Sequence, residues 1–172
     1  MRGLDCRQTT MFHFVAVEDR VPASHPLRLV RSVAVDIAHD LQPKVDLLFA
    51  DSGRASLPPE QVMRAMLLWG LYGVPSERRL LEELDYNLLF RWFVGLGLED
   101  PVWAHTTFRI NKRRLLSSGL VGEFLARVLP RIRGRQLIGN DHFNPDWSLF
   151  EEWQGQQRLR TPAREETVDT FE

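Results

Sequence analysis

Apolar residues are most concentrated in residues 84–97, LDYNLLFRWFVGLG, where Asp85 and Arg91 are the only charged side chains. Removing one large apolar side chain from water contributes about 1.5–3 kcal/mol to folding. A segment with so many of these side chains is stable only when it is buried. We therefore expect residues 84–97 to lie in the core of a folded domain.

The spacing of apolar residues predicts helices along most of the chain. In the first helix they recur mainly at three- and four-residue steps, at Leu27, Val30, Val33, Val35, Ile37 and Leu41, and Pro43 is expected to end it. Similar patterns predict helices over residues 59–72, 77–85, 88–94 and 106–116, and from residue 120 to Pro130, which should kink or finish the last one. The predicted fold is an all-α helical bundle up to about residue 134.

Capping residues support several of these helix starts. Ser76 and Asn87 precede predicted helices and are favourable N-caps, as is Ser24 or the residue after it for the first helix. Thr106-Thr107 is expected to cap the helix that follows it. Only a short glycine-containing turn separates the helices at 59–72 and 77–85, which predicts an αα-hairpin of the kind found in helix-turn-helix modules.

Composition is that of an ordinary globular protein. The chain has 172 residues, of which 44% are hydrophobic and 26% are charged, so it is too apolar to be disordered. Its only cysteine, Cys6, cannot form an internal disulfide, and no Cys/His group has the spacing of a metal site. Residues 1–20 hold no apolar signal-peptide core, and no run of eighteen uncharged apolar residues occurs. We expect a cytoplasmic protein with no membrane partner.

Basic residues gather in one part of the chain, although the formal net charge is only −1. Residues 105–135 hold eight basic residues and one acidic residue, whereas residues 141–172 hold three basic and eight acidic residues. A helix with several neighbouring cations can bind DNA phosphates, and an arginine in it can read a guanine edge. The candidate DNA-binding residues are Arg109, Lys112, Arg113, Arg114, Arg127 and Arg131. The competing interpretation is a solvent-exposed helix face without a ligand.

Aromatic residues form a second candidate group, which consists of Trp69, Tyr72, Trp92, Phe93 and Trp103. Aromatic side chains beside cations can stack on the bases of single-stranded nucleic acid. At helical spacing among leucines, they more often pack in a core. We favour the core interpretation.

From residue 136 the sequence changes character. Short apolar pieces are separated by Gly139-Asn140 and Asn144-Pro145, which suggests the first strand of a different structure. Residues 156–172 are polar, and we expect them to be frayed.

Four blocks of the sequence resemble a known family. They are VEDRVPASHPLR, LPPEQVMRAMLL, SERRLLEELDYNLLFRWFVGLG and EDPVWAHTTF. Together they resemble the N-terminal domain of bacterial insertion-sequence transposases of the InsH type, which are DDE enzymes, and the resemblance covers residues 10–155. It implies a helical domain that binds the terminal inverted repeats of the element, followed by an RNase H-like α/β domain.

The resemblance also implies a role for Asp146 in HFNPDWSLFEEW. In the family, the first aspartate of the DDE triad follows a His-Phe pair on the first strand and binds one of two Mg²⁺ ions. Here Pro145 precedes Asp146 and Trp147 follows it, where the family has a β-branched residue and a small one. Because proline suits a central strand poorly, Asn-Pro-Asp also fits a simple turn. The candidate catalytic and metal-binding residue is Asp146, as a relic of the first DDE acid.

The sequence thus predicts four regions: an irregular arm (1–24), a helical DNA-binding domain (25–134), a first-strand remnant of the catalytic domain (135–155) and a polar tail (156–172). The other two DDE carboxylates lie further downstream in the family, so we expect a transposase portion that is inactive alone and binds no cofactor, with Mg²⁺ reserved for the full-length family. Its expected partner is double-stranded DNA. The alternatives are an oligomerisation module that pairs with itself or with full-length transposase and inhibits it, and a decayed reading frame.

Overall fold

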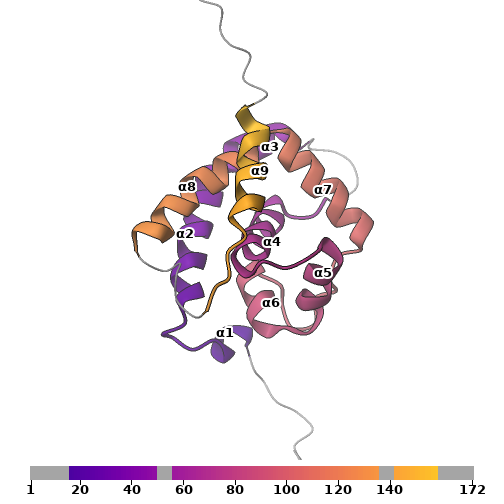
Figure 1. Ribbon diagram of the computed structural model, residues 1–172. Helices are drawn as coiled ribbons and strands as arrows, with labels where there is room; N and C mark the ends of the chain where they lie inside the picture. Colours follow the sequence, from indigo (N-terminus) through magenta and orange to yellow (C-terminus); the bar gives the residue numbers. More distant parts are fainter. Residues whose placement is uncertain (1–15, 50–55, 136–141, 159–172) are drawn as a thin grey trace, which may run out of the picture.

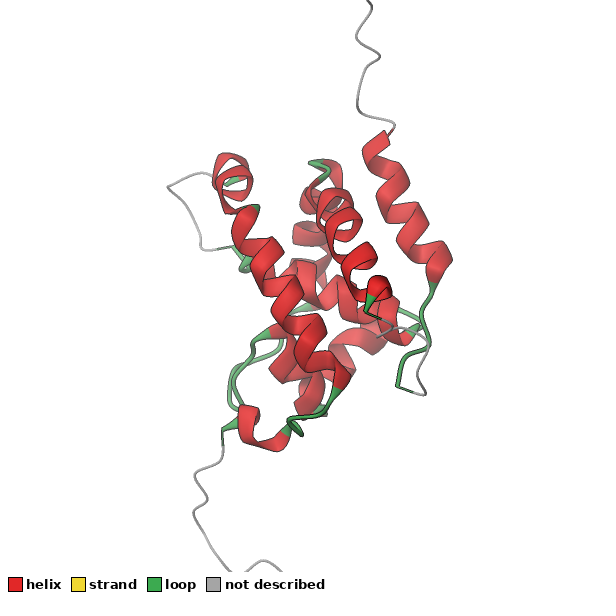
Figure 2. Cartoon of the chain, turned by 90° about the vertical axis from the view of Figure 1, so that its left-hand side faces the viewer, coloured by secondary structure: helices red, strands yellow, loops and turns green. Residues whose placement is uncertain are grey.

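The computed structural model describes residues 16–49, 56–135 and 142–158, and in these ranges every regular element is a helix (Figures 1 and 2). The all-α prediction is therefore confirmed for the described ranges. The helices are α1 (Val17–Arg20), α2 (Pro26–Asp40), α3 (Gln42–Leu48), α4 (Pro59–Tyr72), α5 (Glu77–Tyr86), α6 (Leu88–Val94), α7 (His105–Ser117), α8 (Leu120–Gly134) and α9 (Trp147–Arg158).

Helix α4 forms the centre of the domain. Between Val62 and Leu71 every residue except Arg64 is buried, because α4 packs against α2, α6, α7, α8 and α9 (Figure 1). Pro59 suits the first turn, where no backbone donor is needed. The helix ends at Gly73, whose φ of 55° is a left-handed conformation that glycine adopts readily.

The apolar stretch at 84–97 is buried, as the sequence predicts. Phe93 and Val94 of α6 have no exposed surface. Arg91 is also buried, and its guanidinium donates to the carbonyl of Leu84 at 2.9 Å and to that of Gly97 at 3.1 Å. This charge is tolerated in the core because backbone oxygens surround it, and it ties the end of α5 to the loop after α6.

The predicted N-caps at Ser76 and Asn87 are confirmed. Ser76 Oγ accepts from the backbone N–H of Arg79 at 3.1 Å, and Asn87 Oδ1 accepts from that of Leu89 at 3.1 Å. For α2 the cap is one residue after Ser24, at His25, whose Nδ1 accepts from Leu27. The prediction of threonine caps for α7 is wrong: the helix begins at His105, so Ala104 is the N-cap and no side chain caps it.

Helix α2 ends at Asp40, before Pro43, as the sequence predicts, but Pro43 and Pro130 lie within later helices. Pro43 lies in the first turn of α3, a helix that the pattern of apolar residues did not reveal, and proline is compatible with that position. Pro130 lies inside α8, which continues to Gly134. Buried residues on both sides, Leu129 and Ile132, keep the helix packed beyond the missing backbone donor.

The strand expected within residues 135–155 is not found where the structure describes this segment. Residues 147–155 belong to α9, and residues 136–141 lie outside the described ranges. Helix α9 packs against α8, α7 and α4, and Phe150 is only 1% exposed. A Cβ atom at Gly70 would collide with the Phe150 ring, so the two helices meet very closely. Helix α9 is thus part of the helical core, not an element separate from it.

The described helices include none that is both long and apolar enough to cross a membrane.

Candidate nucleic-acid interface

Helix α7 carries four of the six basic residues that the sequence predicts for DNA binding. Its inner side buries Phe108, Asn111 and Leu115, which lie at three- and four-residue steps. The opposite side is exposed over its length. We define the outer face of α7 as the exposed residues Thr106, Arg109, Ile110, Arg113, Arg114 and Ser117.

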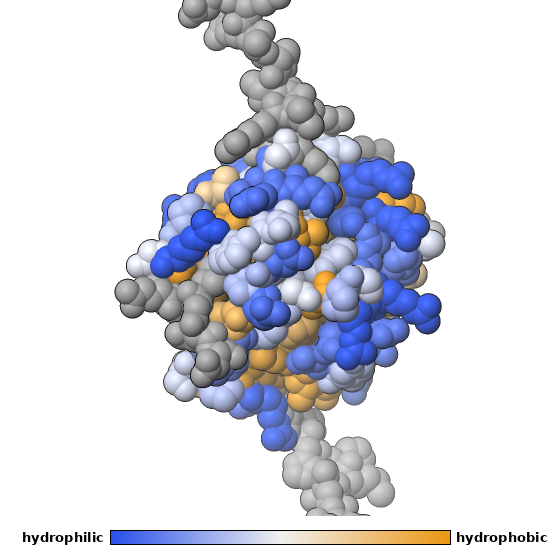
Figure 3. Space-filling model, in the orientation of Figure 1, coloured by the Kyte–Doolittle hydropathy of each residue, from blue (hydrophilic) through white to orange (hydrophobic). Residues whose placement is uncertain are grey.

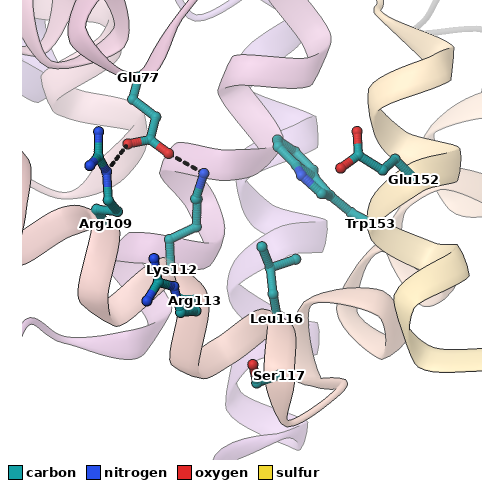
Figure 4. Close-up of a pocket in the computed structure, with 8 residues that line it drawn as sticks. All are labelled: Glu77, Arg109, Lys112, Arg113, Leu116, Ser117, Glu152 and Trp153. Atoms are coloured by element: carbon teal, nitrogen blue, oxygen red, sulfur yellow. Dashed lines mark hydrogen bonds and ion pairs between the residues drawn. The ribbon is translucent and has the colours of Figure 1, made fainter. Parts of the chain in front are cut away.

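Lys112 does not belong to this outer face, because Glu77 of α5 binds it. Lys112 Nζ donates to Glu77 Oε1, and both side chains are only 16% exposed (Figure 4). The ammonium group also lies 5.1 Å from the centre of the Trp69 ring. Lys112 therefore has a structural role, because it joins α7 to α5 and α4.

Three basic side chains of α7 lie around the carboxylate of Glu77. Besides Lys112, its Oε2 lies 3.2 Å from His105 Nε2 and 3.6 Å from Arg109 Nε. Burial raises the pKa of Glu77, but the hydrogen bond from Lys112 and the charges of Lys112, Arg109 and His105 outweigh burial and lower that pKa below its ordinary value. Arg109 remains 55% exposed, so it is only partly engaged.

A pocket of about 320 Å³ separates this cluster from α9. Arg109 and Arg113 line one side of it, and Glu152 and Trp153 of α9 line the other (Figure 4). Because basic and acidic side chains both face it, the pocket is not a specific site for an anion. It shows instead that Arg113 lies at the border between α7 and the acidic part of α9.

The exposed side of α7 offers two arginines that have no ion pair with any residue in the described ranges. They are Arg113 and Arg114, which lie side by side in the sequence. The guanidinium of Arg114 lies 5.1 Å from the centre of the Phe49 ring, a neutral side chain that does not cancel its charge. Figure 3 shows a largely hydrophilic surface on the side where α5 and α7 lie in Figure 1.

The predicted cations of α8 do not extend the outer face of α7. Helix α9 packs against both α7 and α8 and lies between them in Figure 1. Arg127 forms an ion pair with Asp40 of α2. Arg131 is exposed and has no acidic partner among the described residues, so it is a separate, isolated cation.

Helix α5, the second helix of the predicted helix-turn-helix hairpin, has a different charge. It holds four acidic residues and two arginines. Arg78 pairs with Glu82 at 3.4 Å, and Arg79 pairs with Glu83 at 2.6 Å. This helix offers a polyanion no uncompensated positive charge.

A comparison with family models matches residues 15–114 of the chain to a transposase domain, DUF772. The match spans more than half of the chain, from α1 to Arg114 in α7. The chain belongs to the DUF772 transposase-domain family. No curated protein and no solved structure matches it.

The family match includes three cations of the outer face, Arg109, Arg113 and Arg114. Arg127, Arg131 and Asp146 lie beyond the match.

Asp146 caps a helix in this transposase-family chain. Its Oδ1 accepts from the backbone N–H of Leu149 at 3.0 Å, in the first turn of α9, and its own N–H donates to the carbonyl of Gly70 at 2.8 Å. No group of three or more His, Cys, Asp or Glu residues within the described ranges could hold a metal ion. These residues do not fit the Mg²⁺ site that the resemblance implies, and the catalytic role of Asp146 stays a prediction.

The core interpretation of the aromatic group is confirmed for its most buried members. Trp69, Trp92 and Phe93 are each less than 10% exposed. Trp103 stacks on Phe108, with ring centres 5.8 Å apart. The three buried rings are not available to stack on bases, whereas Trp103 and Tyr72 are only partly buried.

The sequence did not predict a cluster of charged side chains around the Trp92 ring. Its Nε1–H donates to Glu18 of α1, while the guanidinium groups of Arg28 and Arg31 lie 5.2 and 4.9 Å from its ring centre. Hydrogen bonds from Trp92 and Arg28 lower the pKa of Glu18. The cluster joins α1, α2 and α6, and no sequence signal connects residues so far apart.

Proposed function

We propose that this chain is the DNA-binding portion of an InsH-type insertion-sequence transposase and recognises the terminal inverted repeats through the outer face of α7. The observation that carries the proposal is the pair Arg113 and Arg114, exposed and without an acidic partner among the described residues. Both lie inside the region that matches the transposase family.

The shape of α7 suits a DNA groove. An α-helix with its side chains is about 10–12 Å across, and the major groove of B-DNA is about 12 Å wide. Arg109 and Arg113 are one turn apart on the exposed side, so both can reach phosphates while residues between them approach base edges. Each phosphate contact releases counterions, which makes binding sensitive to salt.

We assign DNA contact to a smaller set of residues than the six candidates. Arg113 and Arg114 are the principal contacts, and Arg109 contributes with the part of its charge that Glu77 leaves uncompensated. Lys112 and Arg127 are assigned structural roles, because Glu77 and Asp40 bind them. Arg131 is a peripheral contact at most. We assign recognition, and not strand cleavage, to the described residues.

The test is a salt titration of binding to duplexes that carry the ends of the element, followed by fluorescence anisotropy. The test variant is Arg113→Ala with Arg114→Ala, and the control is Arg78→Ala with Arg79→Ala. Both remove two charges from exposed helix positions. We expect the test variant to lose roughly tenfold or more in affinity and to reduce the slope of log K against log[salt] by about 2. The control should lose less than about twofold.

Equal losses in both variants would contradict the proposal, since only net charge would then matter. A dimer that forms with increasing protein concentration, together with DNA affinity that neither variant changes, would favour the oligomerisation module instead. Sedimentation velocity on the same three proteins distinguishes these outcomes.

A further inference from the structure

An exposed isoleucine lies in the middle of the outer face of α7. Ile110 is 62% exposed, although isoleucine is among the residues most often fully buried. Thr106 precedes it by one turn, and Arg113 and Arg114 follow it by three and four residues. Neighbours at these spacings share one side of a helix.

The charge near Ile110 distinguishes it from Tyr86 and Leu98, two other apolar side chains that are more than half exposed. Tyr86 donates to the Glu83 carboxylate, and Leu98 is followed directly by Glu99 and Asp100. Ile110, in contrast, is next to arginines without an acidic partner in the described ranges. An apolar side chain beside two uncompensated positive charges suits a partner that is a polyanion and also presents apolar groups.

Duplex DNA is such a partner. Its phosphates carry negative charge, and each thymine presents a C5-methyl group in the major groove. On the basis of the DNA binding proposed above, we propose that Ile110 is a specificity-determining residue that packs against a thymine methyl group. Arg113 and Arg114 position the helix on the neighbouring phosphates.

The experiment begins with selection of bound duplexes from a library with a random core, by the full chain. Thymines of the selected site are then replaced one at a time by deoxyuridine, which differs only in lacking the C5-methyl group. At one position the wild-type chain should lose about fourfold in affinity, as expected for one methyl group returned to water. The Ile110→Ala variant should bind the two duplexes equally.

Two controls separate this effect from general weakening. Leu98→Ala removes another exposed apolar side chain outside α7 and should keep the wild-type response to deoxyuridine. The salt slope of Ile110→Ala should equal that of the wild type, because no charge has changed.

The outcomes for Ile110 and for DNA binding itself are distinguishable. If the chain binds no duplex, the proposed function fails. If it binds DNA but selection enriches no sequence, or if Ile110→Ala responds to deoxyuridine as the wild type does, the role of Ile110 is overturned while DNA binding stands.

Discussion

Lys112 and Arg113 are neighbours in sequence but have opposite environments. The ammonium group of Lys112 points toward Glu77 and Trp69, and only 16% of its side chain is exposed. Arg113 is exposed and has no ion pair in the described ranges. On a helix, one residue corresponds to a rotation of about 100°, which is enough to turn a DNA-binding candidate into a structural residue.

This difference shows that counting the cations in a sequence overestimates the number of residues that are free to bind DNA. The acid that neutralises Lys112 lies 35 residues earlier in the chain, on another helix. A cation is available to phosphate only if no acid from a neighbouring element already binds it. Three of the six predicted DNA-binding residues, Arg113, Arg114 and Arg131, meet this condition among the described residues.

The largest expected effect on stability comes from Lys112→Met. The change leaves the mostly buried Glu77 carboxylate without its closest partner, so the free energy of unfolding should fall by about 2–3 kcal/mol. Urea denaturation followed by circular dichroism measures it. Arg113→Met is the matched control and should change stability by less than about 0.5 kcal/mol. Similar losses for both variants would contradict the distinction between them.

A second prediction concerns pH. The pKa of Glu77 is lowered from 4.5, so the charged carboxylate contributes stability above pH 4.5 that is lost as pH falls through its folded-state pKa. Glu77→Gln should remove this contribution. The difference in unfolding free energy between the wild type and the variant should therefore shrink as pH is lowered below 4.5. A difference that is constant from neutral to acidic pH would show that the Glu77 charge is unimportant.

The smallest effect on the free energy of unfolding is expected for a substitution of Arg127. Its partner Asp40 is 53% exposed, and water screens such an ion pair. Arg127→Ala should reduce the unfolding free energy by no more than about 1 kcal/mol and leave DNA affinity nearly unchanged. A loss of DNA affinity as large as that of the Arg113→Ala, Arg114→Ala variant would mean that α8, not α7, carries the interface.

Local chemistry made much of the fold predictable. The caps at Ser76 and Asn87 and the left-handed Gly73 depend on residues a few positions away, and the buried segment around Phe93 follows from its apolar density. Helix α9 also had a local signal, since Trp147, Phe150 and Trp153 lie three residues apart. The resemblance to a family segment that forms a strand favoured a strand here, and that prediction is wrong for residues 147–155.

The site was predictable only in part, because its geometry depends on distant residues. Sequence predicted the helix that carries four of the six candidate cations, which the structure shows as α7. It could not show that Glu77 lies against Lys112, or that Asp146 caps α9 and bonds to Gly70. These pairings arise from the packing of helices, which no local pattern specifies.

The most direct test of the central claim is a ¹H–¹⁵N spectrum of the chain during titration with the selected duplex. The account predicts that the largest amide shift changes fall between Arg109 and Ser117 and that the amides of α5 change little. Changes concentrated on α5 or α8, or spread evenly over the domain, would contradict the assignment of DNA recognition to the outer face of α7.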